Sequence, residues 1–396
     1  MIPTPTPSAA TTPSSSGLTL KLVAPSYAAN GAETVWDTVT ADFHAANPDI
    51  TVDVDEQSSG ALVGERAIAE QADLMIGLPV SAFAGDNLNS YYAADEIAPA
   101  GNDVLPYFAY AASTADANGK TKKIGIPVTA SALELFYNTQ IFAQAHIAKP
   151  PATWNDIATD AAKINAVGKT GIGLPMGTPD TLTTLQLWTK GNGGGLMNAA
   201  KTTYTVNQAA NVDTLRWLQD TLIKPGLSEF STYEAGERGV KLDFAEGDLG
   251  MVVADPGLIA QTRAGTVGTA FGTAHMAGRY GTTSYTLGTV DELIASRAHP
   301  ENKAAIAKFV AFLLQPKYQK LIADHAGTLP VTRSGVAAES QDTLLKPFLD
   351  ALPSADWLPT GTPSWTALED YVSAAGAQVN DPKLFLDHAQ AAATGR

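Results

Sequence analysis

The stretch of residues 119–138, GKTKKIGIPVTASALELFYN, constrains the fold more than any other part of this chain. One extended run ends at residues 124–127, a short connection of small and polar residues follows at 129–132, and residues 133–137 form a second run rich in strand-favouring side chains. Apolar side chains fall on both faces of the second run, so neither face suits solvent alone. The pattern predicts two strands joined by a crossing, with the second strand buried near a domain junction.

Length and composition set broad limits. A chain of 396 residues is long for one hydrophobic core, so two lobes are expected. Hydrophobic residues make up 45% and charged residues 16%, as in a globular protein. The formal net charge of -15 argues against nucleic acid or an anionic membrane as the main partner. Cysteine is absent, which excludes disulfides, thiolate metal sites and a cysteine nucleophile.

Neither a membrane span nor a folded N-terminus is predicted. The best apolar run begins at Ala304, is shorter than the roughly 18 residues of a spanning helix, and contains Lys308. Residues 1–17 are Pro, Thr and Ser with almost nothing to bury, and predict a disordered tether. An exported lipoprotein has a signal peptide and an acylated cysteine ahead of such a tether, and we expect both to lie outside this sequence. The alternative is a flexible terminus of a cytosolic protein.

The chain opens with a β-α-β pattern. Residues 18–24 predict a strand, residues 33–46 predict a helix with apolar side chains at helical spacing, and residues 50–54 predict a second strand. Asn47-Pro48 ends the helix. This order of elements predicts a parallel sheet.

The hinge stretch and several later motifs resemble the extracellular solute-binding proteins of ABC importers, the sugar-binding family that includes maltose-binding protein. Each motif is weak, but they follow one another in the family's order from about residue 18 to residue 391. The quoted segments are NPDITV at 47–52, ADLMIG at 72–77, PATW at 151–154, FAEGDLGMVV at 244–253, HPENKAAIAKF at 299–309 and GTLP at 327–330.

The resemblance implies an α/β fold with two lobes, of the type II periplasmic-binding-protein kind. Each lobe would contain a sheet rich in parallel strands, and a three-segment hinge would join the lobes around a ligand cleft. We expect residues 18–129 and 290–328 to form lobe one, and residues 130–289 and 329–396 to form lobe two. In such sheets ligands lie beyond the carboxyl ends of the strands.

Enzyme and metal motifs are not met. Residues 163–170 end in Gly-Lys-Thr but lack the earlier glycine of a phosphate loop, and no dinucleotide fingerprint, Gly-x-Ser-x-Gly or His-Glu-x-x-His occurs. Asp53, Asp55 and Glu56 resemble half a calcium loop, but Gln57 breaks the pattern, so a solvated strand end is favoured over a metal site. Acid pairs for glycoside hydrolysis stay open, because the partners can lie far apart in the chain.

A sugar site needs aromatic platforms and planar polar groups that donate and accept hydrogen bonds. Family contact regions, or their neighbourhood, contain Tyr27, Ser131, Asp255, Arg279, Tyr280, Tyr285, Trp357 and Trp365, which we predict to bind ligand. Surface exposure is the alternative for Tyr27, and a helix N-cap before Pro256 is the alternative for Asp255. The remaining tryptophans have the spacing of core or helix-start residues and are predicted to be structural: Trp36, Trp154, Trp188 and Trp217.

Two positions depart from the relative. Gly77 and Gly257 stand where maltose-binding protein has stacking tryptophans, so the resemblance does not imply maltodextrin binding. A cleft with fewer aromatic platforms is better suited to a smaller sugar, a polyol, or a phosphorylated or amino sugar.

These observations predict the carbohydrate-binding component of an ABC transporter, which captures a sugar by lobe closure and delivers it to the permease. The protein would be a monomer without cofactor or catalytic activity, lipid-anchored in its native form at the extracellular face of the cell envelope. Two alternatives stay open. One is a binding protein for polyamine, thiamine or a metal, and the other is a secreted carbohydrate-acting enzyme.

Overall fold

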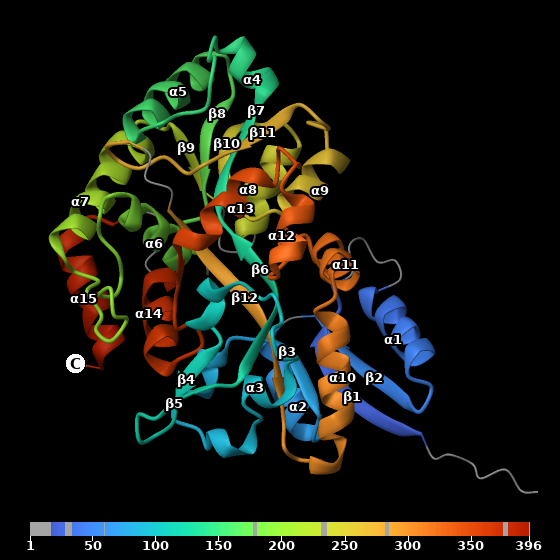
Figure 1. The fold of residues 1–396 in the computed structure, drawn as a ribbon. Coiled ribbons are helices and arrows are strands. Elements are labelled where there is room, and N and C mark those ends of the chain that lie inside the picture. The colour runs from blue at the N-terminus through green and yellow to red at the C-terminus, as the bar shows by residue number, and fades with distance from the viewer. Residues whose placement is uncertain are drawn as a thin grey trace, which may run out of the picture.

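The structure is a computed structural model that describes residues 17–27, 34–58, 60–176, 180–230, 236–281, 285–374 and 379–395. The predicted tether, apart from Gly17, and part of the loop after the first strand lie outside these ranges. The described chain forms two α/β lobes, and long strands run between them (Figure 1). The predicted two-lobed fold class is confirmed.

The first sheet has the order β13-β12-β3-β1-β2, with β6 paired to β12. β1 pairs in parallel with β2 and β3, whereas β12 runs antiparallel to β3 and β6. Helices α1, α10 and α11 share a core with one face of this sheet, and α2 packs on the other. The bounds are β1 (Leu18–Pro25), β2 (Ile50–Gln57), β3 (Leu74–Leu78), β6 (Gly125–Ala132), β12 (Thr286–Ala295), β13 (Ala355–Trp357), α1 (Val35–Ala46), α2 (Gly60–Ala69), α10 (Lys303–Leu313) and α11 (Pro316–Ala326).

The predicted β-α-β opening is confirmed, and its ends have local causes. Thr34 and Asp37 form a capping box at the start of α1, and Asn47 caps its end. The apolar stripe of the helix faces the sheet, where Phe43 meets the rings of Phe309 and Phe312 edge-on at 5.0 and 5.3 Å. These contacts hold α1 and α10 on the same face of the first sheet.

The second sheet has the order β11-β7-β10-β8-β9 and is also mixed. One face packs on α5, α6, α7, α14 and α15, and the other on α8, α9 and α13. The bounds are β7 (Glu134–Asn138), β8 (Thr170–Leu174), β9 (Ser228–Phe230), β10 (Leu249–Ala254), β11 (Phe271–Ala274), α5 (Trp154–Ala166), α6 (Thr181–Gly191), α7 (Ala209–Trp217), α8 (Gly236–Ala245), α9 (Leu258–Ala264), α13 (Lys346–Ala351), α14 (Pro363–Ala374) and α15 (Pro382–Thr394).

Shorter elements complete the chain. A π-helix, Leu218–Ile223, continues α7. A small hairpin lies beside the first sheet (Figure 1). The bounds are α3 (Ala94–Ile97), β4 (Ser113–Ala115), β5 (Thr121–Lys123), α4 (Thr139–Gln144) and α12 (Arg333–Glu339).

The hinge stretch differs from the prediction in one respect. β6 does not end at Pro127 but continues to Ala132, and only Leu133 separates it from β7. Pro127 lies where the register with β12 shifts, and such an irregularity tolerates a residue without an N–H. The third crossing pairs with the same strand, because Leu329 and Ala130 exchange backbone hydrogen bonds of 2.7 and 2.9 Å.

The positions of the lobe boundaries stay a proposal. Pairing in the first sheet extends along β6 to Ala132, beyond the proposed boundary at 129, and along β12 back to Thr286. The hinge strands therefore belong to the first sheet for most of their length and reach the second lobe only at their ends.

The ring of Trp357 on β13 packs so closely on Gly288 of β12 that it leaves no room for a side chain there. A Cβ at Gly288 would lie 2.2 Å from that ring, and the ring itself is 6% exposed. The absence of a side chain thus allows the short parallel pairing of β13 with the hinge strand.

Replacing Gly288 with Ala is expected to destabilise the protein by about 1–3 kcal/mol, because the methyl group overpacks the Trp357 contact. Urea unfolding measures the change. Gly17→Ala is the matched control, since its Cβ would meet nothing closer than 3.5 Å. Equal stability of the two variants would show that the ring does not need the glycine.

Candidate functional site

Three cavities follow the cleft between the lobes. Cavity 1, of about 420 Å³, lies at the hinge, and shares Thr289 with cavity 3 and Ala326 and Gly327 with cavity 2. Cavities 2 and 3 measure about 760 and 720 Å³. All three adjoin carboxyl ends of parallel strands, the position where ligands bind in open α/β sheets.

Cavity 1 is lined by the ends of β8 and β10, by α6, and by the hinge strands β6 and β12. Ser131 reaches it from β6, and its Oγ is buried without a hydrogen-bond partner among the described residues. Trp188 from α6 forms another part of the wall. A buried hydroxyl without a partner is costly, so a polar ligand atom at this position would be stabilising.

Asp255 lies beside cavity 1 and just before α9, whose N-cap is Gly257 rather than Asp255. Its side chain lines cavity 1, while Oδ1 accepts a hydrogen bond of 2.8 Å from the N–H of Gly257, just before α9. Its Oδ2 forms an ion pair of 2.5 Å with Nζ of Lys241. The carboxylate is thus held in place by a helix start and by a cation at the edge of the cavity.

Tyr27 lines cavity 2, between the carboxyl ends of β1 and β2 and helices α8 and α9 of the other lobe. Its hydroxyl donates a hydrogen bond of 2.5 Å to Oδ2 of Asp291 on β12. Burial, followed by repulsion from Asp291, raises the pKa of Tyr27 well above its usual value. Tyr27 therefore stays a neutral donor and ties the loop after β1 to the hinge strand.

Cavity 3 lies between β3, the β4 hairpin and the loop after β13. Trp357 and Tyr110 contribute rings, and Lys201 reaches over the Tyr110 ring at 4.3 Å. Asp291 and Glu292 line the same cavity from β12. Aromatic and acidic groups therefore line the same cavity.

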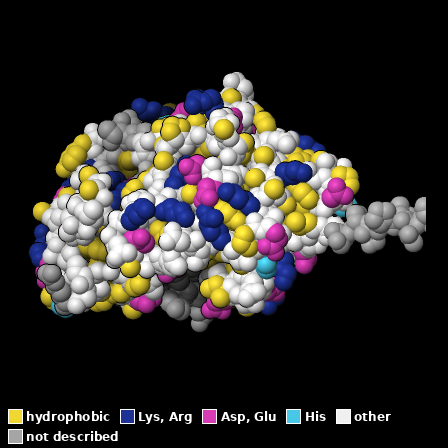
Figure 2. Space-filling view, turned by 60° about the horizontal axis from the view of Figure 1, so that its bottom comes forward, with side chains coloured by type: hydrophobic (Ala, Val, Ile, Leu, Met, Phe, Trp, Pro, Cys, Tyr) yellow, Lys and Arg dark blue, Asp and Glu magenta, His cyan; other side chains and the backbone are white. Residues whose placement is uncertain are grey.

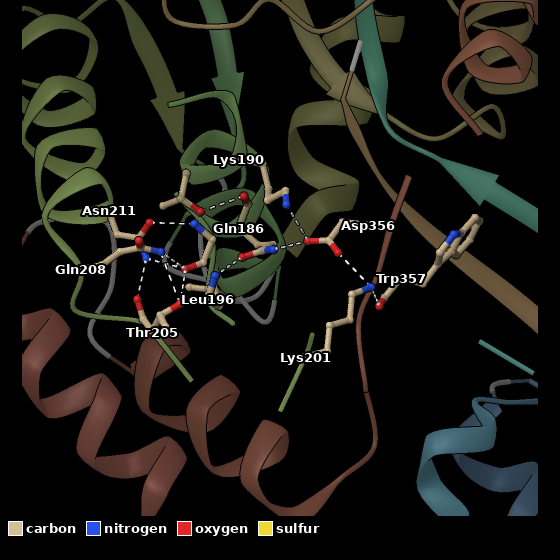
Figure 3. A network of polar contacts seen from close by, with 11 residues as sticks. Gln186, Lys190, Leu196, Lys201, Thr205, Gln208, Asn211, Asp356 and Trp357 are labelled. Carbon is tan, nitrogen blue, oxygen red and sulfur yellow. Dashed lines mark hydrogen bonds and ion pairs between the residues drawn. The ribbon is translucent and has the colours of Figure 1, made fainter. Parts of the chain in front are cut away.

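A polar network fixes the strand β13 beside this cavity (Figure 3). Asp356 forms ion pairs with Lys201 at 3.0 Å and Lys190 at 3.4 Å, and accepts a hydrogen bond of 2.8 Å from Gln186. Nζ of Lys201 also donates to the carbonyl oxygen of Trp357. Burial alone would raise the pKa of Asp356, but attraction and hydrogen bonding by the two lysines outweigh it and hold the pKa below its usual value.

The glycine-rich loop after α6 is ordered by the same network. Gln186 accepts a hydrogen bond of 2.7 Å from the N–H of Leu196. Asn211 of α7 exchanges hydrogen bonds of 3.0 and 2.9 Å with the backbone of Gly195 (Figure 3). The loop that carries Lys201 is thus anchored to α6 and α7.

Four of the predicted ligand residues are not brought to the three cavities. Arg279 pairs with Asp213 at 2.5 Å and lies over the Trp154 ring, and Tyr280 is 85% exposed. Tyr285 and Trp365 are buried in the core of lobe two. Their position gives no support to a ligand role, whereas Tyr27, Ser131, Asp255 and Trp357 do line the cleft.

Sequence reasoning missed Asp291, Glu292, Tyr110 and Lys201. The acidic pair had a recognisable signal, because two adjacent carboxylates stand inside the otherwise apolar strand pattern TLGTVDELIA. Tyr110 and Lys201 had none, since both lie in loops. Trp188 was correctly predicted to be a core residue, with 1% exposure, and also borders cavity 1.

The face of the molecule seen in Figure 2 shows side chains of both charges. On the face seen in Figure 2, Lys and Arg side chains lie next to Asp and Glu side chains. Among the described residues, no three His, Cys, Asp or Glu side chains form a group that could hold a metal ion. Nor does any helix within the described ranges have the length and apolarity needed to span a bilayer.

Replacing Asp356 with Asn should destabilise the protein by about 1–3 kcal/mol at pH 7, because Lys201 is left largely buried without its counter-charge. The contribution of a carboxylate with lowered pKa is present above its unfolded pKa and is lost as pH falls through the folded value. The stability gap to the wild type should therefore narrow below about pH 4. Urea unfolding at pH 7 and pH 3 tests this.

Asp220→Asn serves as the control, because its pair with Lys224 is exposed and is expected to contribute less than about 1 kcal/mol. A gap between wild type and the Asp356 variant that stays constant across both pH values would contradict the electrostatic account.

Comparison with known proteins agrees with this geometry. A family model described as bacterial extracellular solute-binding protein matches residues 28–320. A Brucella abortus (strain 2308) protein named as a binding protein is 27% identical over 263 residues, which cover 65% of this chain and 62% of the relative. The match therefore spans less than two thirds of that relative.

Solved structures share the fold at low identity. The GacH receptor of Streptomyces glaucescens has a TM-score of 0.77 and 20% identity, with 94% of this chain and 97% of that chain covered. UgpB of Mycobacterium tuberculosis has a TM-score of 0.78 and 17% identity, with 96% and 98% covered. With most of its length matched by the family model, the chain belongs to the bacterial extracellular solute-binding protein family.

Proposed function

We propose that this protein binds a carbohydrate in cavity 1 and delivers it to the permease of an ABC importer. The observation that carries the proposal is the Oγ of Ser131, buried without a described partner in a cavity at the hinge between two lobes. The volume of about 420 Å³ falls within the range of small-molecule sites.

The lining of cavity 1 suits a polyhydroxylated ring. Hydroxyl groups of Ser131, Thr183 and Thr289 can donate and accept hydrogen bonds, and the carboxylates of Asp180 and Asp255 can accept them. Leucine side chains and Trp188 offer apolar surface for the C–H faces of a sugar. A ligand with alternating polar edges and apolar faces matches both kinds of lining.

The charged residues that line the cavities favour some of the sugar types proposed from the sequence over others. Of the residues that the structure describes, six carboxylic acids line the three cavities, against one lysine and one histidine: Asp180, Glu246, Asp255, Asp291, Glu292 and Asp324, with Lys201 and His325. Because the lysine in this lining, Lys201, is already paired with Asp356, an anion would meet mainly carboxyl groups in the described part of the cleft. A neutral or amino sugar is therefore favoured over a phosphorylated one.

Lobe closure is the proposed mechanism. Cavities 2 and 3 take their walls from both lobes, so a ligand that bridges them stabilises the closed arrangement and raises its population. The closed form would then be recognised by the permease. The crystal structures of the GacH receptor include a complex with acarbose, which supports a carbohydrate ligand.

The proposal also covers the oligomeric state, the location and the absence of catalysis. The protein would act as a monomer at the extracellular face of the cell envelope, held there by a lipid anchor. It would carry out no catalysis, because its role ends with release of an unchanged solute.

A thermal-shift screen against neutral monosaccharides, short oligosaccharides and polyols is expected to raise the unfolding midpoint with one structural group of sugars, since a ligand of the folded state stabilises by mass action. Ser131→Ala should weaken binding of that sugar about 3–10-fold, for one lost hydrogen bond of about 1 kcal/mol. Calorimetry measures the affinity.

Ser340→Ala is the control, because Ser340 is exposed and lies outside the cleft. No response to any sugar, together with a response to a polyamine, thiamine or a metal, would overturn the carbohydrate assignment. Turnover of a bound sugar would overturn the non-catalytic role.

A further inference from the structure

Two adjacent carboxyl groups on the hinge strand β12, the buried Glu292 and the partly buried Asp291, have no ion-paired cation among the described residues. Asp291 accepts its hydrogen bond from the Tyr27 hydroxyl. Glu292 is 1% exposed, and its Oε2 accepts a bond of 3.2 Å from the N–H of Val80. No Lys, Arg or His among the described residues forms an ion pair with either acid. Buried carboxylates are ordinarily paired with a cation, and this pair lacks that kind of partner within the described residues.

Glu292 keeps one oxygen unused. Its Oε1 is buried and has no hydrogen-bond partner among the described residues, although the side chain lines cavity 3. The hydrogen bond from the N–H of Val80 accounts for the burial of Oε2, but nothing comparable accounts for the burial of Oε1. Burial accordingly raises the pKa of Glu292 well above its usual value, and an adjacent positive group would favour the ionised form.

The sheet is built around this side chain. Opposite Glu292 the registers of both neighbouring strands shift, so that Gly77 is skipped on β3 and Val128 on β6. A Cβ at Gly125 would lie 2.5 Å from Cγ2 of Val80 and 3.2 Å from Cβ and Cγ of Glu292, so this glycine leaves space for both side chains. Such irregularities redirect side chains and occur next to functional sites.

A metal ion does not account for the pair. Ca²⁺ needs six or more oxygen ligands and Zn²⁺ needs four donors. Within the described residues no group of three potential ligand side chains exists. An ammonium group has three N–H donors and needs only a few acceptors, which two carboxyl groups and a nearby hydroxyl can supply.

Cavity 3 already accommodates one ammonium group. Nζ of Lys201 lies over the Tyr110 ring, donates to the Trp357 carbonyl and pairs with Asp356. This arrangement satisfies Lys201, which therefore does not pair with the carboxyl groups of Asp291 and Glu292. The same cavity therefore combines aromatic faces with a vacant acceptor for a second cation.

We propose that cavity 3 receives an ammonium group of the ligand, which donates to Oε1 of Glu292 beside Asp291. The inference rests on the proposed function, in which the sugar ring occupies cavity 1, because Thr289 lines both cavities. The ligand class is then an amino sugar or an oligosaccharide that contains one.

Calorimetric titration of the purified protein with matched sugars tests the proposal. The probes are glucose, glucosamine, N-acetylglucosamine and glucose 6-phosphate, and the disaccharides cellobiose and its diamino counterpart chitobiosamine. The amine of a matched pair is expected to bind at least 10-fold more tightly than its hydroxyl or acetamide analogue. Glu292→Gln should reduce this preference to about 3-fold or less, and the Gln side chain can still accept a hydrogen bond from the N–H of Val80.

Glu65→Gln, an exposed acid on α2, is the control and should keep the preference. Asp291→Asn, which keeps an acceptor for Tyr27, is the second variant if Glu292→Gln unfolds. Neutral sugars that bind as tightly as amines to the wild type would overturn the ammonium site and leave the proposed function standing. Binding of putrescine but no sugar, lost in Glu292→Gln, would support the ammonium site and overturn the carbohydrate assignment. Absence of all binding would overturn both.

Discussion

The antiparallel pairing of β6 with β12 is the interaction on which the rest of this structure depends. Seven residue pairs join the strands from Gly288–Ala132 to Ile294–Gly125, and Leu329 adds the third crossing at Ala130. Each hydrogen bond contributes modestly to stability, but together they restrict most of the backbone dihedral angles that could rotate between the lobes. The lobes can therefore move relative to each other mainly where these strands end.

The position of the site follows from this hinge. Cavity 1 lies against the carboxyl end of β6 and the amino end of β12, where Ser131 and Thr289 line it. Cavity 3 continues along β12 to Glu292. A ligand that touches residues of the hinge strands and of both lobes can bias closure, because its contacts differ between the open and closed arrangements.

The sequence predicted the fold better than the site. The start of α5, for example, is encoded locally, because Thr153 caps the helix together with Asp156, only three positions away. Trp365 illustrates the limit: its place in a motif suggested the cleft, but α14 packs that face into the core of lobe two. Which face of a helix meets which lobe depends on tertiary packing. The position of Asp291 and Glu292 beside cavity 3 depends on register shifts in two neighbouring strands, which the sequence alone does not show.

The most direct test of the account is small-angle X-ray scattering of the protein with and without a saturating sugar identified by calorimetry. The central claim is that ligand in the cleft stabilises lobe closure about the β6–β12 hinge. The radius of gyration should then fall on binding, and the long-distance part of the pair-distance distribution should shorten. Identical scattering curves at proven saturation would contradict closure as the response to ligand.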